Sequence, residues 1–183
     1  MQYYGRQYGS GQRYLLKALR EVAEQVDGLL RGLDDRELVW RPAADEWCAK
    51  EIVGFLRDSD REDLHAVRAI IARDGARVEE RRALHGPAEH DYRSLRIREL
   101  LSSFEALHDE LMWTLRDTGA GWEHAGEHPY RGRVPLELWV HEISERDLEA
   151  TWKLRRLLDH LEVDGAPRPT PPAGRRRRSS RRR

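Results

Sequence analysis

The sequence predicts an all-α fold, a four-helix bundle with long connections. Four segments place apolar residues three and four positions apart, along one face of a helix. Glycine or proline lies at an end of three of these segments, as is usual at helix termini. No segment alternates apolar and polar residues for long enough to predict a sheet.

The first helix is expected over roughly residues 12–33 and the second over roughly residues 48–73. Gly75 follows the second helix as a stop signal. The predicted apolar faces are Leu15, Leu19, Val22, Val26, Leu29 and Leu33 in the first helix, and Ile52, Phe55, Leu56, Val67, Ile70 and Ile71 in the second.

The third helix is expected over roughly residues 95–117, with Ser94 as its N-cap, and the fourth over roughly residues 135–161. Pro135 suits a first helical turn, where its missing N–H is not needed. The predicted faces are Ile97, Leu100, Leu101, Phe104, Leu111 and Leu115, and then Leu136, Trp139, Val140, Ile143, Ala150, Leu154, Leu157 and Leu161. The long connections, residues 34–47, 74–94 and 118–134, are typical of functional loops or crossovers.

Composition excludes several classes of protein. Charged residues make up 36% of the 183 residues, and no apolar run approaches the roughly 20 residues that span a membrane. The first residues lack the apolar stretch of a secretory signal. Cys48 is the single cysteine, which excludes an internal disulfide and a multi-cysteine zinc site. A cytoplasmic location is therefore expected.

The net charge of zero conceals a division of charge along the chain. All acidic residues lie at or before Asp164, whereas eight arginines follow Ala166. We expect a flexible N-terminal lead over residues 1–11, a bundle domain over 12–163 and a disordered Pro/Arg-rich tail over 164–183. The tail is either an arm for an anionic partner or an incidental extension lying over the acidic body.

Cys48 and Glu51 are spaced like a helix capping box in which sulfur replaces a hydroxyl. A thiol at a helix N-terminus can also be reactive. Because the sequence supplies no histidine partner, the capping interpretation is favoured.

Histidines offer a few candidate metal ligands. His141 and Glu145 share the spacing of a metalloprotease helix, but the second histidine of that motif is missing. His124 and His128 lie in a glycine-rich loop, where they either orient the loop or hold a metal. The remaining histidines, His65, His85, His90, His108 and His160, are scattered, and for each a surface or partly buried imidazole is expected.

Three segments resemble the DinB/YfiT-like family. They are WRPAADEWCAKEIVGFLRDSDR at residues 40–61, HPYRGRVPL at residues 128–136, and the last helix from Glu142 to the LRRLL run that ends at Leu158. The resemblance spans roughly residues 12–161. It implies a four-helix bundle with a long crossover, and it also implies that a homodimer forms.

The resemblance further implies a divalent metal held by three histidines, and metal-dependent reactions that use small thiols. The matching positions here are Phe55, Arg146 and Ala150, while Asp147 keeps the family's intervening acid. None of the three replacements offers a lone pair to a metal, so neither a metal nor another cofactor is expected. Imidazole or carboxylate groups converging from three helices would contradict this expectation. A shifted alignment would place His141 and Glu145 at the site instead.

The replacements are consistent with one another physically. Phe55 would fill the volume beside the small Ala150, and Arg146 would bring a permanent positive charge close to the cation position. The expected partners of that charge are Asp147, Asp58 or Glu142. The alternative is drift, in which a lost metal site accumulates ordinary residues.

Two functions follow from these expectations. The first is a non-catalytic DinB-like binding or interaction module, with a small-molecule ligand in the cleft between helices. The alternative is a metal-dependent thiol transferase or hydrolase. Its divalent metal would be held by a non-standard set drawn from His141, Glu145, Glu142 or His128.

Overall fold

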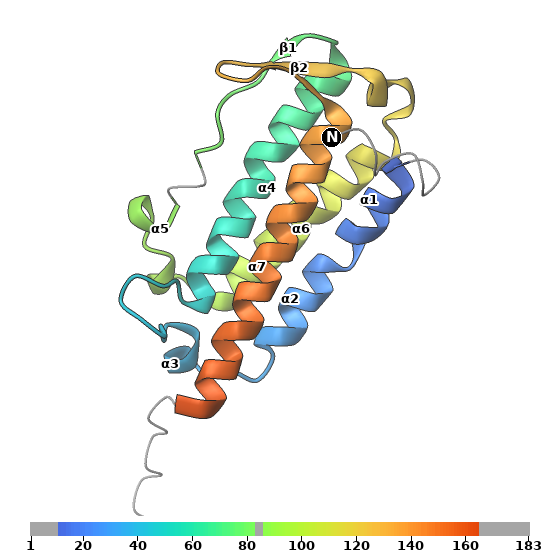
Figure 1. Cartoon of the computed structure of the whole chain (residues 1–183). Helices are drawn as coiled ribbons and strands as arrows, with labels where there is room; N and C mark the ends of the chain where they lie inside the picture. The colour runs from blue at the N-terminus through green and yellow to red at the C-terminus, as the bar shows by residue number, and fades with distance from the viewer. Residues whose placement is uncertain (1–10, 83–85, 165–183) are drawn as a thin grey trace, which may run out of the picture.

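The computed structural model describes residues 11–82 and 86–164 of the chain, and these form a four-helix bundle (Figure 1). The first rod consists of α1 (Gly11–Arg20) and α2 (Val22–Leu30). The other three are α4 (Ala49–Ala72), α6 (Ile97–Arg116) and α7 (Leu136–Asp164). The predicted fold class is therefore confirmed.

The first rod divides at Glu21, where the sequence predicts one continuous helix. Neither glycine nor proline stands at the division. Instead, the carbonyl of Leu19 lies 2.9 Å from Nε2 of His108 on α6, within hydrogen-bond distance. A side chain that binds a helix carbonyl is a known cause of a kink, and His108 supplies one here.

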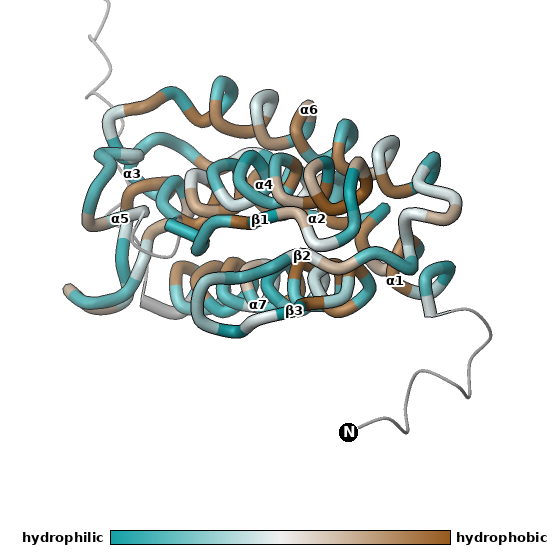
Figure 2. The backbone as a smooth tube through the Cα atoms, turned by 90° about the horizontal axis from the view of Figure 1, so that it is seen from above, coloured by the Kyte–Doolittle hydropathy of each residue, from teal (hydrophilic) through white to brown (hydrophobic). Residues whose placement is uncertain are grey.

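Two apolar clusters fill the bundle, and the hydrophobic positions of α4, α6 and α7 turn inward in Figure 2. One cluster contains Leu64, Val67 and Ile70 of α4, together with residues from α1, α6 and the start of α7. The other contains Ile52, Val53 and Leu56 of α4, with residues from α2, α6 and the end of α7. Between the two clusters, α4, α6 and α7 bury charged and polar residues instead.

Short elements occupy the connections. The turn α3 (Asp35–Leu38) begins with a capping box in which Asp34 accepts from the Glu37 N–H at 2.9 Å. A helical turn, α5 (Gly86–Glu89), and two 3-10 turns, η2 (Tyr92–Ser94) and η3 (Gly119–Glu123), flank α6.

A small sheet covers one end of the bundle, and this corrects the expectation that no sheet forms. Its strands are β1 (Ala76–Arg77), β2 (Ala125–His128) and β3 (Gly132–Pro135). The central strand β2 pairs parallel with β1 and antiparallel with β3. Strands of two to four residues are too short to show an alternating pattern. Pro135, which is expected in the first turn of the last helix, is instead the last residue of β3, and α7 begins at Leu136.

The sheet is tied to the end of α4. Asp74 accepts from the Ala125 N–H at 2.9 Å, and Gly75, at a φ of 72°, donates its own N–H to the Ala125 carbonyl at 2.8 Å. This left-handed backbone conformation is one that glycine adopts without strain. The turn after α4 therefore aligns β1 beside β2.

None of the described helices is both long enough and apolar enough to cross a membrane. The N-terminal lead is expected over residues 1–11 and the Pro/Arg-rich tail over residues 164–183, and all but one residue of each lies outside the described residues. The two described residues are helical, since Gly11 begins α1 and Asp164 ends α7.

Gly54 of α4 packs directly against the ring of Tyr92, which is 1% exposed. A Cβ at position 54 would lie 2.7 Å from Cε1 of that ring. We expect Gly54→Ala to lower the free energy of unfolding by about 1–3 kcal/mol through overpacking. Urea denaturation measures the change.

Gly28 of α2 provides the matched control, because a Cβ there meets nothing within 4 Å. Gly28→Ala should leave stability unchanged or raise it by roughly 0.5–1 kcal/mol, since alanine favours a helix interior. Equal effects of the two substitutions would contradict the packing argument.

Candidate functional site

The three positions singled out by the family resemblance lie together. Phe55 of α4 and Arg146 and Ala150 of α7 line one cavity of about 360 Å³. Phe55 is 9% exposed and Ala150 is 3% exposed. Residues of α4 and α7, two helices that are distant along the chain, therefore share this cavity.

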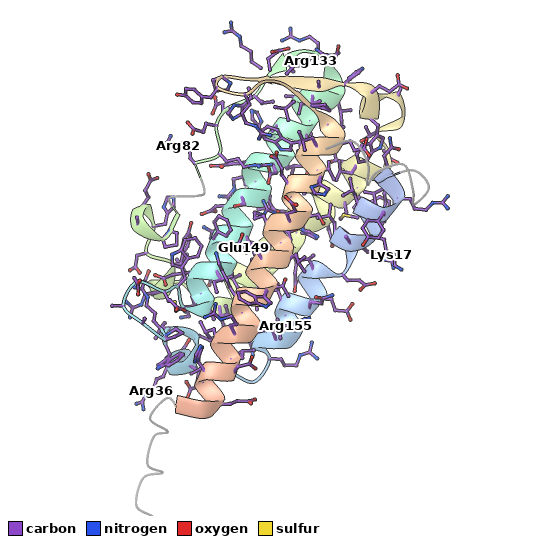
Figure 3. All side chains as sticks on the ribbon, viewed as in Figure 1. Lys17, Arg36, Arg82, Arg133, Glu149 and Arg155 are labelled. Carbon is purple, nitrogen blue, oxygen red and sulfur yellow. The ribbon has the colours of Figure 1, made fainter. Side chains whose placement is uncertain are left out.

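Aromatic and acidic side chains complete this cavity. The rings of Trp47 and Phe55 pack edge to face, with centroids 5.2 Å apart. Figure 3 shows Glu149 on α7, and this residue also lines the cavity. We call this space the Trp47 cavity; its lining is Trp47, Ile52, Phe55, Glu142, Glu145, Arg146, Glu149, Ala150 and Lys153.

The guanidinium of Arg146 turns away from solvent and binds three fully buried carboxylates. Its Nε donates to Asp147 Oδ1 at 2.9 Å, and Nη1 donates to Asp63 Oδ2 at 2.5 Å. Nη2 donates to Asp60 Oδ1 and to Asp147 Oδ1. Desolvation lowers the pKa of Arg146, but the charges of Asp147, Asp60 and Asp63 outweigh it and leave the pKa raised. The cation is therefore permanent.

A second layer holds Asp63 in place. Its Oδ1 accepts from Arg81 Nε at 2.7 Å and from Trp139 Nε1 at 2.9 Å. The Arg81 guanidinium lies over the Trp139 ring at 4.4 Å, a cation–π contact. We call the whole set the Arg146 network; it consists of Asp60, Asp63, Arg81, His108, Trp139, Arg146 and Asp147.

Of the three partners expected for Arg146, the structure supplies one, Asp147. Asp58 instead accepts from the Tyr92 hydroxyl at 2.7 Å and pairs with Arg57. Glu142 binds Arg131. Asp58 points away because it lies two positions before Asp60 on α4, on a different face of the helix.

Carboxylate and imidazole groups from three helices do converge, contrary to the sequence expectation. Asp60 of α4, His108 of α6 and Asp147 of α7 are all buried, and their candidate ligand atoms lie within 4.8 Å of one another. Such a trio has the composition of a divalent metal site. A metal can bind there only if the nitrogen and oxygen atoms of these three side chains have lone pairs free to coordinate it.

Both ring nitrogens of His108 are already in hydrogen bonds. Nδ1 lies 2.9 Å from Asp60 Oδ2, and Nε2 lies 2.9 Å from the Leu19 carbonyl. Both partners are acceptors, so both nitrogens must donate, and only the imidazolium carries two N–H groups. Burial lowers the pKa of His108, but the hydrogen bond and charge of Asp60 outweigh this effect and raise the pKa to about 9. In this state the ring has no lone pair for a metal.

One carboxylate oxygen of Asp147 is a hydrogen-bond acceptor of the network that accepts no hydrogen bond from the described residues. Its Oδ1 accepts from Arg146, while Oδ2 is buried and has no hydrogen-bond partner among the described residues. Burial raises the pKa of the Asp147 carboxyl to about 6, against the opposing charge of Arg146. The other carboxylate oxygens of the trio are bound to Arg146 or to His108. With a guanidinium and an imidazolium in contact with these carboxylates, the residues do not fit a divalent cation in the observed arrangement.

The structure favours the capping interpretation of Cys48. The thiol is buried, and the Cys48 N–H donates to Glu51 Oε2 at 2.8 Å in a capping box. Burial raises the pKa of the thiol, which opposes thiolate chemistry.

The other candidate ligands lie apart from the Arg146 network. His141 is exposed, with Nδ1 3.6 Å from Glu145. Nδ1 of His124 lies 3.0 Å from the Ile70 carbonyl near the end of α4, so this ring orients its loop. His128 accepts from the Tyr130 N–H at 3.2 Å. The described residues therefore place no second donor set around His141, His124 or His128.

Sequence reasoning missed Asp60 and Asp63, and its expectation of a surface or partly buried imidazole at His108 is wrong, because this side chain is 1% exposed. A signal was present, because Asp60 and Asp63 share a helical stripe with Leu56 and Val67. His108 likewise lies between Phe104 and Leu111 on the apolar stripe of α6. Ionisable residues inside an apolar stripe are rarely buried without partners, and this signal predicts an internal network.

Known proteins share this fold. YfiT from Bacillus subtilis, described as a probable metal-dependent hydrolase with an unusual four-helix bundle topology, superposes with a TM-score of 0.71. The two chains are 15% identical, and the match covers 83% of this chain and 88% of YfiT.

A mycothiol-dependent maleylpyruvate isomerase superposes with a TM-score of 0.63 and 14% identity. That match covers 78% of this chain but 60% of the isomerase. No curated protein sequence shows significant similarity to the chain. A sequence profile of the DinB superfamily matches residues 18–145, most of the bundle. The chain therefore belongs to the DinB superfamily.

Proposed function

We propose that this chain is a metal-independent binding module of the DinB superfamily, which takes a small molecule in the Trp47 cavity. The supporting observation is the position of Arg146. Arg146 lines the cavity, and its guanidinium binds three buried carboxylates that are not among the lining residues. On this proposal Phe55, Arg146 and Ala150 replace the family's ligands, and the guanidinium supplies the positive charge of a cation.

Charge balance supports this assignment. The buried carboxylates of Asp60, Asp63 and Asp147 face three cations of the network, so the network is close to neutral without a metal. The cations are Arg146, Arg81 and the imidazolium of His108. A divalent ion would add charge beside a buried guanidinium, where the low dielectric makes repulsion strong.

The cavity itself suits a ligand. Its volume of about 360 Å³ falls in the range of small-molecule sites, which are mostly apolar with a few polar groups. Phe55, Ile52 and Ala150 supply the apolar floor, and the glutamates of α7 supply the polar groups. On this proposal these lining residues serve in binding and are given no catalytic step.

The convergence of Asp60, His108 and Asp147 favours a second candidate function, a metal-dependent thiol transferase or hydrolase. YfiT is described as a probable metal-dependent hydrolase, and the isomerase is described as mycothiol-dependent. For this function His108 must lose a proton and give up one hydrogen bond, and Arg146 must leave the carboxylates. The observed arrangement therefore supports the first function better.

Metal analysis of the purified chain separates the two functions. After dialysis against zinc, nickel or manganese, elemental analysis should find far less than one metal ion per chain. One ion per chain that is lost in His108→Gln would establish the buried trio as a metal site. An ion that is lost instead in His141→Ala would place the metal at the exposed pair, and either result overturns the proposal.

Removing the guanidinium should leave three buried carboxylates short of one cation. We expect Arg146→Met to lower the free energy of unfolding by about 3–5 kcal/mol at neutral pH, the usual cost of breaking a buried ion pair. Manganese or zinc should restore part of that stability to Arg146→Met and add none to the unaltered chain. Urea denaturation with and without the metal measures both effects.

Arg155→Met is the matched control, because Arg155 is exposed on the same helix and contacts Gln25 of α2 only at 3.5 Å. Its loss should change stability by less than about 1 kcal/mol. A similar small loss in Arg146→Met would show that the network contributes little.

The charged state of His108 should make stability depend on pH. Its pKa is about 9 in the folded chain, above the value of about 6.5 for an unfolded histidine. Its contribution is therefore complete below about pH 6.5 and is lost as the pH rises towards 9. We expect the free energy of unfolding to fall between pH 6.5 and 8.5, by at most about 1.4 kcal/mol per pH unit.

His108→Gln should flatten this slope, whereas His141→Gln, at an exposed position, should keep it. Denaturation at several pH values measures the slopes. Identical slopes in all three proteins would show that His108 is not the charged group.

A further inference from the structure

The lining of the Trp47 cavity points to a class of ligand. We propose that it binds a monovalent organic cation with an apolar group, such as an arylalkylammonium. This inference rests on the proposed binding function and goes further by naming the ligand class. It follows from the aromatic wall, from the charge of the lining and from a lysine that already lies in the expected place of the ligand's ammonium group.

The aromatic wall is the first line of support. Trp47 is half-buried and stands edge to face with Phe55, so its orientation is fixed by packing. An indole face attracts cations more strongly than other aromatic side chains do. Ile52, Phe55 and Ala150 beside it offer apolar surface for the rest of the ligand.

The charge of the lining is the second line of support. The buried aspartates neutralise Arg146, and Arg131 neutralises Glu142. This leaves Glu145 and Glu149 against one cation, Lys153. The ion pair of Glu145 in the described part of the chain is a long one, 3.6 Å to an exposed His141. The lining thus has about one carboxylate in excess.

Lys153 shows how an ammonium group is held in this cavity. Its Nζ lies 2.8 Å from Glu149 Oε1 and 5.6 Å from the centroid of the Trp47 ring. A carboxylate and an aromatic face together are a usual receptor for an alkylammonium. Because Lys153 is about half exposed, its amine can move into solvent and give up both contacts to a ligand.

A neighbouring cavity offers room for a longer ligand. It has a volume of about 240 Å³ and shares Trp47, Ile52 and Lys153 with the Trp47 cavity. In its lining the Arg156 guanidinium lies over the Trp152 ring at 4.9 Å, a second cation–π contact. The lining of both cavities thus uses tryptophan faces to hold positive charge.

Three probes of matched shape test the ligand class by isothermal titration calorimetry: 2-phenylethylammonium, the neutral 2-phenylethanol and the anionic 3-phenylpropionate. We expect the cation to bind about tenfold more tightly than the neutral probe, and the anion to bind weakest. Trp47→Leu should weaken binding of the cation, which locates it in the cavity.

Variants of the two α7 glutamates and of the lysine sharpen the test. Glu145→Gln and Glu149→Gln should each weaken the cation's binding about fivefold, because each removes a carboxylate from the lining. Lys153→Gln should strengthen it about threefold, because the competing internal ammonium is gone. Glu162→Gln, an exposed position on α7 outside both cavities, should change nothing.

A preference for the anion, equal binding of all three probes, or no binding of the cation would each overturn the ligand class. The proposed function has its own test in the metal analysis. If the chain is free of metal and binds the neutral or anionic probe in a Trp47-dependent manner, the binding function is supported and the proposed cationic class of ligand is contradicted. If the chain holds one metal ion, the proposed metal-independent binding function is contradicted.

Discussion

The interaction on which the rest of the structure depends is the Arg146 guanidinium bound to Asp60, Asp63 and Asp147. It joins α7 to α4, and Asp60 continues the network to His108 on α6. His108 in turn reaches the Leu19 carbonyl of α1. One set of charged hydrogen bonds therefore touches all four rods of the bundle, between its two apolar clusters.

A buried ionic network of this kind adds less stability than its hydrogen bonds suggest, since removing charges from water offsets much of their mutual attraction. The guanidinium binds Asp60 and Asp63 of α4 from α7, and the directional geometry of these charged hydrogen bonds favours the observed arrangement of the two helices. The same arrangement helps to set the wall of the Trp47 cavity, because Arg146 lines that space and is held by Asp63 of α4. The shape of the cavity and the order of the core thus have a common origin.

The sequence predicted the bundle well, because long amphipathic stripes with clear ends report burial directly. It also brought Phe55, Arg146 and Ala150 together, through the order of loose family motifs. It missed the partners of Arg146, since pairing between Asp60, Asp63 and His108 depends on how distant helices meet, and periodicity describes one helix at a time. The division at Glu21 was missed for the same reason, because its cause, His108, lies far along the chain.

The bond from His108 to Leu19 has a consequence for motion. α1 has ten residues, too few for a helix to persist alone in water. Its attachment to an ionised group at the centre of the molecule means that it cannot peel away without exposing a buried imidazolium. The N-terminal rod is thus expected to open together with the centre, as part of one cooperative unit, rather than to fray as an independent end.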